Sequence, residues 1–177
     1  MSDHRHLVLV GLMGAGKTTV GRVVAEQLGR PLVDSDAAIE ATTGRTVREI
    51  WLDDGEPAYR VMESAALRTA LADDEPLVIA AAGGVVLAAE NRAALAGPRT
   101  VVVWLTADTA TLVERAARGD HRPLLDDDPG RAMLAMAAAR DGLYREVADV
   151  TVDTAGRSLD AVAADVIAAL AAVTSRG

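Results

Sequence analysis

The 177-residue sequence contains no cysteine and no phenylalanine, and Lys17 is its single lysine. Without cysteine, neither a disulfide framework nor a thiolate metal site can form. No apolar run approaches the roughly 18 residues that a membrane-spanning helix needs. Acidic residues outnumber Lys and Arg by 26 to 18, which gives a net charge of −8. We therefore expect no membrane contact and no nucleic-acid-binding surface, because such a surface needs clustered cations.

The beginning of the chain is also unlike a targeting segment. Residues 1–6 are polar and include two histidines and one arginine, so they do not resemble a signal peptide. We expect a cytoplasmic protein whose residues 1–177 form one domain with an ordinary hydrophobic core. No coiled-coil heptad or apolar stripe suggests an obligate dimer, so we expect a monomer.

Short β-branched runs alternate with helical patterns along the chain. The expected strands are Leu7–Val10, Pro31–Val33, Leu77–Ala80, Val101–Leu105 and Val150–Val152. The expected helices cover residues 16–28, 36–43, 46–72 (broken near 53–55), 90–95, 108–118, 130–147 and 158–173. The strands are almost continuously apolar, which is typical of strands covered on both faces. The order predicts an α/β protein, a three-layer α/β/α domain around a five-stranded parallel sheet.

A phosphate-binding motif follows the first expected strand. Residues 11–18 read Gly-Leu-Met-Gly-Ala-Gly-Lys-Thr, the complete G-x-x-x-x-G-K-[ST] pattern between a strand and a helix. The backbone N–H groups of such a loop cradle phosphates, Lys17 reaches their oxygens, and the Thr18 hydroxyl suits Mg²⁺. We therefore expect a P-loop NTPase. The only asparagine, Asn91, precedes Arg92, so a guanine-reading Asn-Lys-x-Asp segment is missing, and a small phosphotransferase is favoured over a GTPase.

Two carboxylates follow the second expected strand, at the sheet edge where ligands bind in open α/β folds. We expect Asp34 to hold Mg²⁺ through water and Asp36 to take a substrate hydroxyl. The alternative is that one of them, best Asp36, only caps the helix that starts at Ala37.

Three further segments are candidates for a second substrate. Arg60 and Glu63 share a helix face and can pair, which would fix the guanidinium for a substrate carboxylate; a solvated surface pair is the alternative. Gly83 and Gly84 follow the third strand and allow a ligand to approach the backbone closely and to be held by its N–H groups. Residues 117–129 are polar, contain two prolines, and form either a mobile lid or an ordinary surface loop.

Together these motifs resemble the shikimate kinase family. Its members combine a Walker A loop, Asp-x-Asp, Asp-Gly-Glu-x-x-Phe-Arg-x-x-Glu, Gly-Gly-Gly, Arg-Pro-Leu and Arg-x-x-Leu-Tyr. The corresponding segments here are residues 11–18, 34–36, 54–63, 82–84, 122–124 and 140–144. The resemblance covers about residues 7–170. It implies an adenylate-kinase-like fold and ATP- and Mg²⁺-dependent phosphorylation of the 3-hydroxyl of shikimate, a step towards chorismate and the aromatic amino acids.

The resemblance also implies a role for each matched position. The implied catalytic residues are Lys17, Asp36 and Arg122, the last carried by the lid. The implied acceptor site, within a substrate-binding region at about 34–63 and beyond, is Asp36, Trp51, Tyr59, Arg60, Gly83, Gly84 and Arg140. The implied ATP site is Gly14, Ala15, Gly16, Lys17, Thr18, Thr19, Arg115, Arg122 and Arg157, with Thr18 and Asp34 at the metal. The implied adenine pocket also includes the stretch after the last strand, residues 153–157.

Three positions depart from the family pattern. Trp51 and Tyr59 stand where the family usually has phenylalanine, and Ala82 replaces the first glycine of the triplet. Tyr59 thus adds a hydroxyl where the family has an apolar ring edge. The departures reflect either a drift in composition or another acceptor, such as gluconate or another carboxylated polyol or cyclitol. A non-catalytic nucleotide-binding domain is a third possibility, against which the complete acceptor positions argue.

Overall fold

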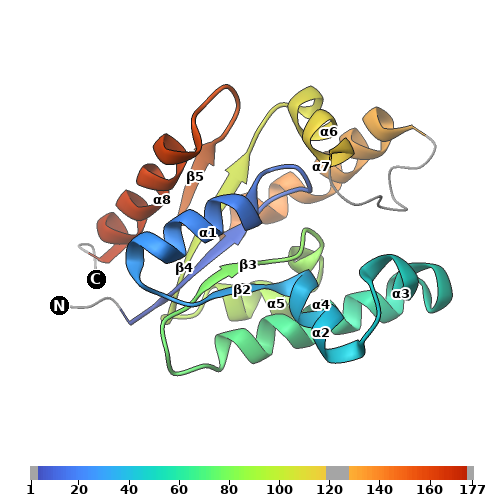
Figure 1. The fold of residues 1–177 in the computed structure, drawn as a ribbon, viewed down its shortest axis with the longest axis horizontal. Helices are drawn as coiled ribbons and strands as arrows, with labels where there is room; N and C mark the ends of the chain where they lie inside the picture. The colour runs from blue at the N-terminus through green and yellow to red at the C-terminus, as the bar shows by residue number, and fades with distance from the viewer. Residues whose placement is uncertain (1–3, 119–127, 175–177) are drawn as a thin grey trace.

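The computed structural model describes residues 4–118 and 128–174 (Figure 1). Its strands are β1 (His6–Val10), β2 (Leu32–Asp34), β3 (Val78–Ala80), β4 (Thr100–Thr106) and β5 (Val150–Asp153). They form one sheet in the order β2-β3-β1-β4-β5, and every neighbouring pair is parallel. The predicted five-stranded parallel sheet is confirmed.

The helices are α1 (Lys17–Leu28), α2 (Ser35–Thr43), α3 (Val47–Asp53), α4 (Gly55–Leu71), α5 (Ala89–Leu95), α6 (Thr109–Ala117), α7 (Pro129–Val147) and α8 (Leu159–Thr174), with a 3₁₀ helix η1 (Val85–Leu87). The predicted break near residues 53–55 is confirmed, because Gly55 has φ +83° and starts a new helix. The expectation that Pro31 opens the second strand is wrong. Strand β2 starts at Leu32, and Pro31, which has no N–H to donate, contributes only its carbonyl, to Val78 N.

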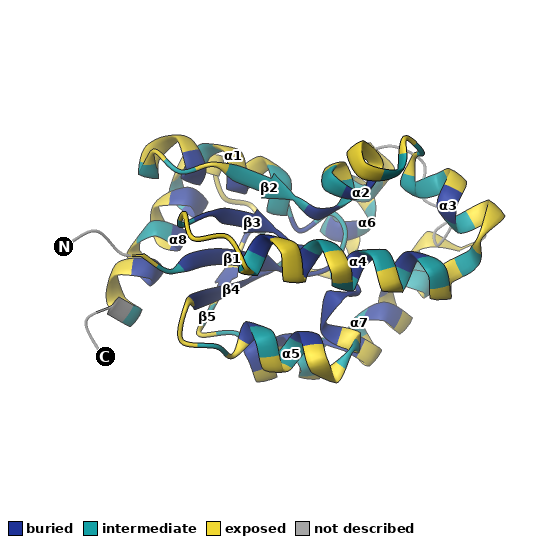
Figure 2. Ribbon diagram, turned by 90° about the horizontal axis from the view of Figure 1, so that it is seen from below, coloured by how far each residue is buried: buried dark blue, intermediate teal, exposed yellow. Residues whose placement is uncertain are grey.

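The sheet lies between two layers of helices. Helices α1 and α8 pack together on one face, and α5 and α7 cover the other, with α4 beside α5 (Figures 1 and 2). The central strands β1 and β3 are buried along their whole length (Figure 2). The predicted three-layer arrangement is therefore confirmed, and it explains why the strands are apolar on both faces.

A second, smaller hydrophobic cluster lies outside the main core. It joins α2, α3 and α4 through buried Ile39, Ile50 and Tyr59, with Trp51 packed against them. Apolar side chains of the predicted substrate-binding region thus pack on one another, near the carboxyl ends of the strands, where the P-loop follows β1.

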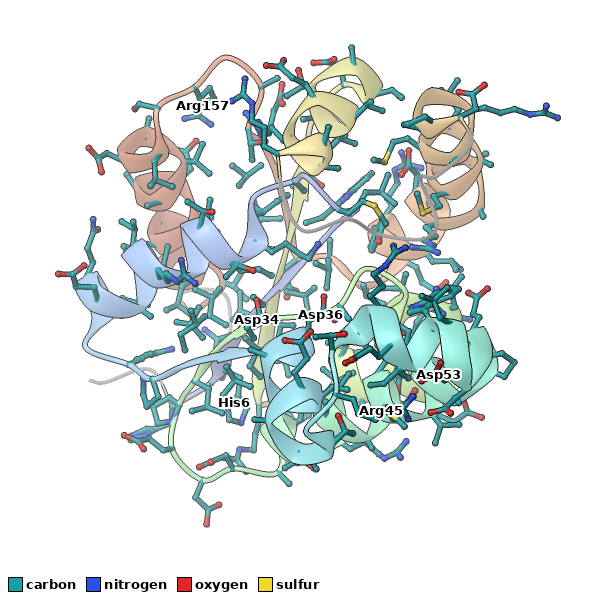
Figure 3. The ribbon with its side chains drawn as sticks, turned by 45° about the vertical axis from the view of Figure 1, so that its right-hand side comes forward. His6, Asp34, Asp36, Arg45, Asp53 and Arg157 are labelled. Atoms are coloured by element: carbon teal, nitrogen blue, oxygen red, sulfur yellow. The ribbon has the colours of Figure 1, made fainter. Side chains whose placement is uncertain are left out.

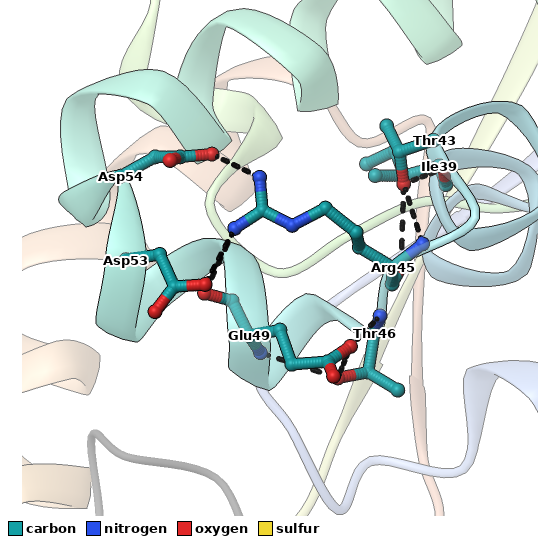
Figure 4. A network of polar contacts seen from close by, with 7 residues as sticks. All are labelled: Ile39, Thr43, Arg45, Thr46, Glu49, Asp53 and Asp54. Atoms are coloured by element: carbon teal, nitrogen blue, oxygen red, sulfur yellow. Dashed lines mark hydrogen bonds and ion pairs between the residues drawn. The ribbon is translucent and has the colours of Figure 1, made fainter.

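A polar network fixes the beginning and end of α3 (Figure 4). Thr46 and Glu49 form a reciprocal capping box, and the hydrogen bonds from Thr46, the backbone bond first, lower the pKa of the Glu49 carboxyl. Arg45 pairs with Asp53 at 3.0 Å and with Asp54 at 2.6 Å. The network holds the short helix that presents Trp51, although seven residues are too few for a stable isolated helix.

Among the helices of residues 4–118 and 128–174, none combines the length and the apolar character that crossing a bilayer requires.

Candidate active site

A cleft of about 1220 Å³ opens at the carboxyl ends of the strands. Parallel pairing brings the segments after β1, β2 and β3 together there, since Leu9 and Asp34 are both in register with Ala80. Figure 3 shows Asp34 and Asp36 close together beside the cleft, with Arg157 on the loop after β5. The cleft is lined by these predicted site residues: Gly14, Ala15, Gly16, Lys17, Thr18, Thr19, Asp34, Asp36, Trp51, Tyr59, Arg60, Gly83, Gly84, Arg115, Arg140 and Arg157. Arg122 and most of the predicted lid lie outside the described residues.

The P-loop has the curled backbone that its glycines predict. Gly14 has φ +80°, and a Cβ there would lie 2.4 Å from the Leu112 carbonyl oxygen, so the loop packs directly on α6. Gly16 (φ +92°) precedes α1 without a side-chain cap, and residues 16–19 at the helix N-terminus line the cleft. Lys17 Nζ donates to the carbonyls of Gly11 at 2.8 Å and Leu12 at 3.0 Å. The ammonium is thereby held at the mouth of the loop.

Thr18 and Asp34 meet across the gap between α1 and β2. The Thr18 hydroxyl donates to Asp34 Oδ2 at 2.5 Å, and Asp34 Oδ1 accepts from Ala37 N at 3.1 Å. Asp34 therefore caps α2, and the alternative that Asp36 is the cap is wrong, because the helix already includes Asp36 in its first turn. Two converging hard oxygen ligands suit Mg²⁺, which takes one or two carboxylates together with phosphates and water.

Asp36 is held by an aromatic neighbour on another helix. The Tyr59 hydroxyl on α4 donates to Asp36 Oδ1 at 2.6 Å. The Tyr59 ring is 4% exposed and lies 5.7 Å, centroid to centroid, from Trp51. The two aromatic residues predicted as a wall of the acceptor site are thus in contact with each other.

Arg60 is fixed by ion pairs and by the same two rings. Its guanidinium pairs with Glu63 at 2.8 Å and Glu56 at 2.7 Å, and its Cζ lies within 5.6 Å of both ring centroids, those of Trp51 and Tyr59. Burial lowers its pKa, but the paired carboxylates outweigh this and raise the pKa of Arg60 above its ordinary value. The predicted Arg60–Glu63 pair is confirmed, and its burial excludes the solvated-surface alternative.

Glu63 connects this arginine to the glycines after β3. It is 2% exposed, and its Oε1 accepts from Gly84 N at 2.9 Å. Burial raises the pKa of Glu63, while Arg60 and the Gly84 N–H oppose the shift. The expectation that the Gly84 N–H holds a ligand is not met here, because that N–H already serves Glu63. A side chain at position 84 would also disturb this arrangement, because a Cβ there would lie 1.8 Å from Arg60 Nη1 and the guanidinium would have to shift.

Arg140 reaches the cleft from α7 beside the preceding glycine. It is 7% exposed, and a Cβ built on Gly83 would lie 3.7 Å from its Nη1. Tyr144, one turn later, donates to the Gly83 carbonyl at 2.5 Å and stacks on Trp104. Burial raises the pKa of Tyr144 far above its ordinary value, so it remains a hydroxyl donor. Consecutive glycines thus each lie against a different arginine.

The opposite end of the cleft carries two more arginines. Arg115 donates to the hydroxyl of Thr154 at 2.8 Å and to its carbonyl at 2.9 Å, which ties α6 to the loop after β5. Arg157 on that loop pairs with Asp165 at 2.7 Å. Thr154 belongs to the stretch at residues 153–157 that the resemblance implies for the adenine pocket, and it lines the cleft together with Arg157.

Comparisons with known proteins agree with this arrangement. The shikimate kinase family profile matches residues 13–171. A shikimate kinase of Symbiobacterium thermophilum is 47% identical over 97% of this chain and 99% of its own length, and one of Pseudomonas savastanoi is 44% identical over the same shares. The solved structure of a shikimate kinase from Acinetobacter baumannii in complex with shikimate superposes with a TM-score of 0.91 at 37% identity, over 97% of this chain and 95% of that one. The chain belongs to the shikimate kinase family.

Proposed function

We propose that the protein transfers the γ-phosphoryl group of ATP to the 3-hydroxyl of shikimate. The observation that carries the proposal is the pair of arginines, Arg60 and Arg140, that lie against Gly84 and Gly83 in the cleft that also holds the P-loop and Asp36. Two guanidinium groups at one end of a cleft match the two oxygens of a carboxylate. Family membership supports the same acceptor.

The P-loop supplies the phosphate end of the reaction. Backbone N–H groups of residues 14–19 and the α1 N-terminus bind the phosphate oxygens. Lys17 Nζ, which donates to two loop carbonyls, turns to the phosphates when the nucleotide enters. Thr18 and Asp34 would hold Mg²⁺, directly or through water. The ion supplies charge neutralisation on the phosphates when bound.

Asp36 acts on the acceptor. Its carboxylate lines the cleft beside the aromatic pair and near the end of β2, within the region that we assign to the acceptor. It accepts a hydrogen bond from the hydroxyl that attacks and so orients that oxygen towards the phosphorus. Phosphoryl transfer depends mainly on positioning and on charge stabilisation, so this orientation is the chief contribution that we assign to Asp36.

The adenine and the lid complete the proposal. Arg115 and Arg157 lie at the far end of the cleft, where a guanidinium plane stacks on a base. Arg122 meets the transferring phosphoryl group when the lid, about residues 117–129, covers it, and closure keeps water from the phosphate. We place the reaction in one kinase domain that acts as a cytoplasmic monomer, without nucleic-acid or membrane partners.

An acceptor screen tests this function. ADP release is measured with ATP, Mg²⁺ and one of three acceptors: shikimate, gluconate or a neutral cyclitol. We expect ADP release with shikimate only. The Lys17→Ala variant should release no ADP, because it lacks the one lysine ammonium group that can contact the phosphates. Release with gluconate or with the cyclitol, and none with shikimate, would overturn the proposed acceptor.

A further inference from the structure

Tyr59 contacts two side chains that we propose to bind the acceptor. Its hydroxyl donates to Asp36 Oδ1 at 2.6 Å, and its ring centroid lies 5.4 Å from the Arg60 Cζ. Asp36 is the proposed partner of the acceptor hydroxyl, and Arg60 is the proposed partner of the acceptor carboxylate. The Tyr59 side chain therefore contacts both the carboxylate proposed to bind the acceptor hydroxyl and the guanidinium proposed to bind the acceptor carboxylate.

The Tyr59 ring itself has little freedom to move. It is 4% exposed and packs with Ile39 of α2 and Ile50 of α3, while Trp51 lies 5.7 Å away. Because side chains of α2 and α3 pack on the ring, the position of the hydroxyl oxygen is restricted. A bond from a fixed hydroxyl to a carboxylate is charge-assisted and restricts the rotation of that carboxylate.

We propose that Tyr59 is a positioning residue for phosphoryl transfer: its hydroxyl holds the Asp36 carboxylate in the orientation that receives the acceptor hydroxyl. The inference rests on the proposed function, because it takes Asp36 as the group that orients the acceptor. It differs from a role in packing, which a phenyl ring at position 59 would fill equally well.

The Tyr59→Phe variant removes the hydroxyl and keeps the ring. We expect kcat to fall roughly tenfold, the loss expected when a hydrogen bond to a charged group no longer acts in the transition state. The KM for ATP should stay unchanged, because the P-loop binds the nucleotide independently of Tyr59. A matched control is Thr100→Val, which removes another buried hydroxyl bond, to the Leu95 carbonyl, at the amino end of β4. That control should lower the melting temperature and leave kcat unchanged.

A double-variant comparison distinguishes positioning from packing. In the Asp36→Ala background, measured by product accumulation over long incubations, Tyr59→Phe should cause no further loss, because the carboxylate that it positions is absent. An equal loss in both backgrounds, or an unchanged kcat in the single variant, would overturn the inference. The kcat values of all variants are measured with an acceptor that supports ADP release by the wild type. If shikimate is not that acceptor, the proposed function fails, but the role of Tyr59 can still be tested with the active acceptor.

Discussion

At the scale of single residues, Arg60 is held from four directions. Glu56 and Glu63 pair with its guanidinium, and the rings of Trp51 and Tyr59 lie beneath it. A guanidinium fixed in this way loses little entropy when it binds a carboxylate, so we expect Arg60 to contribute strongly to the affinity for the proposed acid acceptor.

Removing either arginine should therefore weaken acid binding. We expect Arg60→Ala and Arg140→Ala to raise the KM for shikimate roughly 10- to 100-fold, as for a lost hydrogen bond to a charged group, and to spare the KM for ATP. Arg60→Ala should also lower the free energy of unfolding by about 1–3 kcal/mol, because Glu63 stays buried without its cation. Steady-state kinetics and urea unfolding measure the two effects.

Arg68→Ala, exposed on the same helix, is the control and should leave the KM for shikimate unchanged. A rise only in the KM for ATP would contradict the assignment of Arg60 and Arg140 to the acceptor carboxylate.

The two glycines after β3 should respond differently to a methyl group. In Gly84→Ala the Cβ would overlap Arg60 Nη1 and displace the guanidinium from its position, whereas in Gly83→Ala the nearest atom, the Gly11 carbonyl oxygen, is 3.4 Å away. We expect Gly84→Ala to weaken shikimate binding about as much as Arg60→Ala, and Gly83→Ala to weaken it less. Titration of shikimate binding by calorimetry compares the pair, and equal affinities would contradict the role given to Gly84.

At the scale of elements, local sequence signals determined most helix boundaries. Helix α1 ends before Gly29, as predicted, and starts at Lys17, one residue after the predicted start at Gly16, while α4 starts at Gly55 within the predicted break. The predictions that failed concern the first residue of β2 and the cap of α2, which lie one and two residues from the predicted positions. The resemblance already placed Thr18 and Asp34 at one metal site, but nothing near Gly84 in the sequence reveals that Glu63, 21 residues earlier, accepts its N–H. Such partners become visible only once the helices are placed on the sheet.

Helix α7 contains a glycine that can be improved. Gly142 lies in the interior of α7, is exposed, and has no atom within 4 Å of the position that a Cβ would take. We expect Gly142→Ala to raise the free energy of unfolding by about 0.5–1 kcal/mol, because alanine loses less backbone entropy in a helix. Gly44→Ala is the matched control. It has equal space, but its φ of +67° should make the change destabilising. Urea unfolding measures both, and a loss of stability in Gly142→Ala would contradict the helix assignment.

At the scale of the whole molecule, His6 couples stability to pH. It is fully buried at the start of β1, where Nδ1 accepts from Leu77 N, and within the described residues its Nε2 has no hydrogen-bond partner. Burial, aided by Arg99 and opposed by Asp73, lowers the pKa of His6 below 6.5. The unfolded chain therefore binds this proton more readily than the folded one, and the fold loses stability as the pH falls below about 6.5.

The His6→Asn variant tests this coupling. Asparagine keeps an acceptor for Leu77 N and does not titrate, so its stability should fall less between pH 7.5 and pH 5.5 than that of the wild type. Melting temperatures at fixed ionic strength measure the difference, in which the carboxylates common to both proteins cancel. An identical pH dependence of the melting temperature in the two proteins would show that His6 does not contribute to the loss of stability at low pH.

The central claim, that the cleft recognises an acid acceptor and phosphorylates it, concerns the molecule as a whole, because the P-loop, Asp36 and both arginines must act on one substrate. The most direct measurement is kcat/KM for shikimate beside its methyl ester, which keeps every hydroxyl and loses the negative charge. We predict efficient turnover of shikimate and a value at least roughly tenfold lower for the ester, with the ratio shrinking in Arg60→Ala. Equal values for acid and ester, or no turnover of shikimate, would contradict the account.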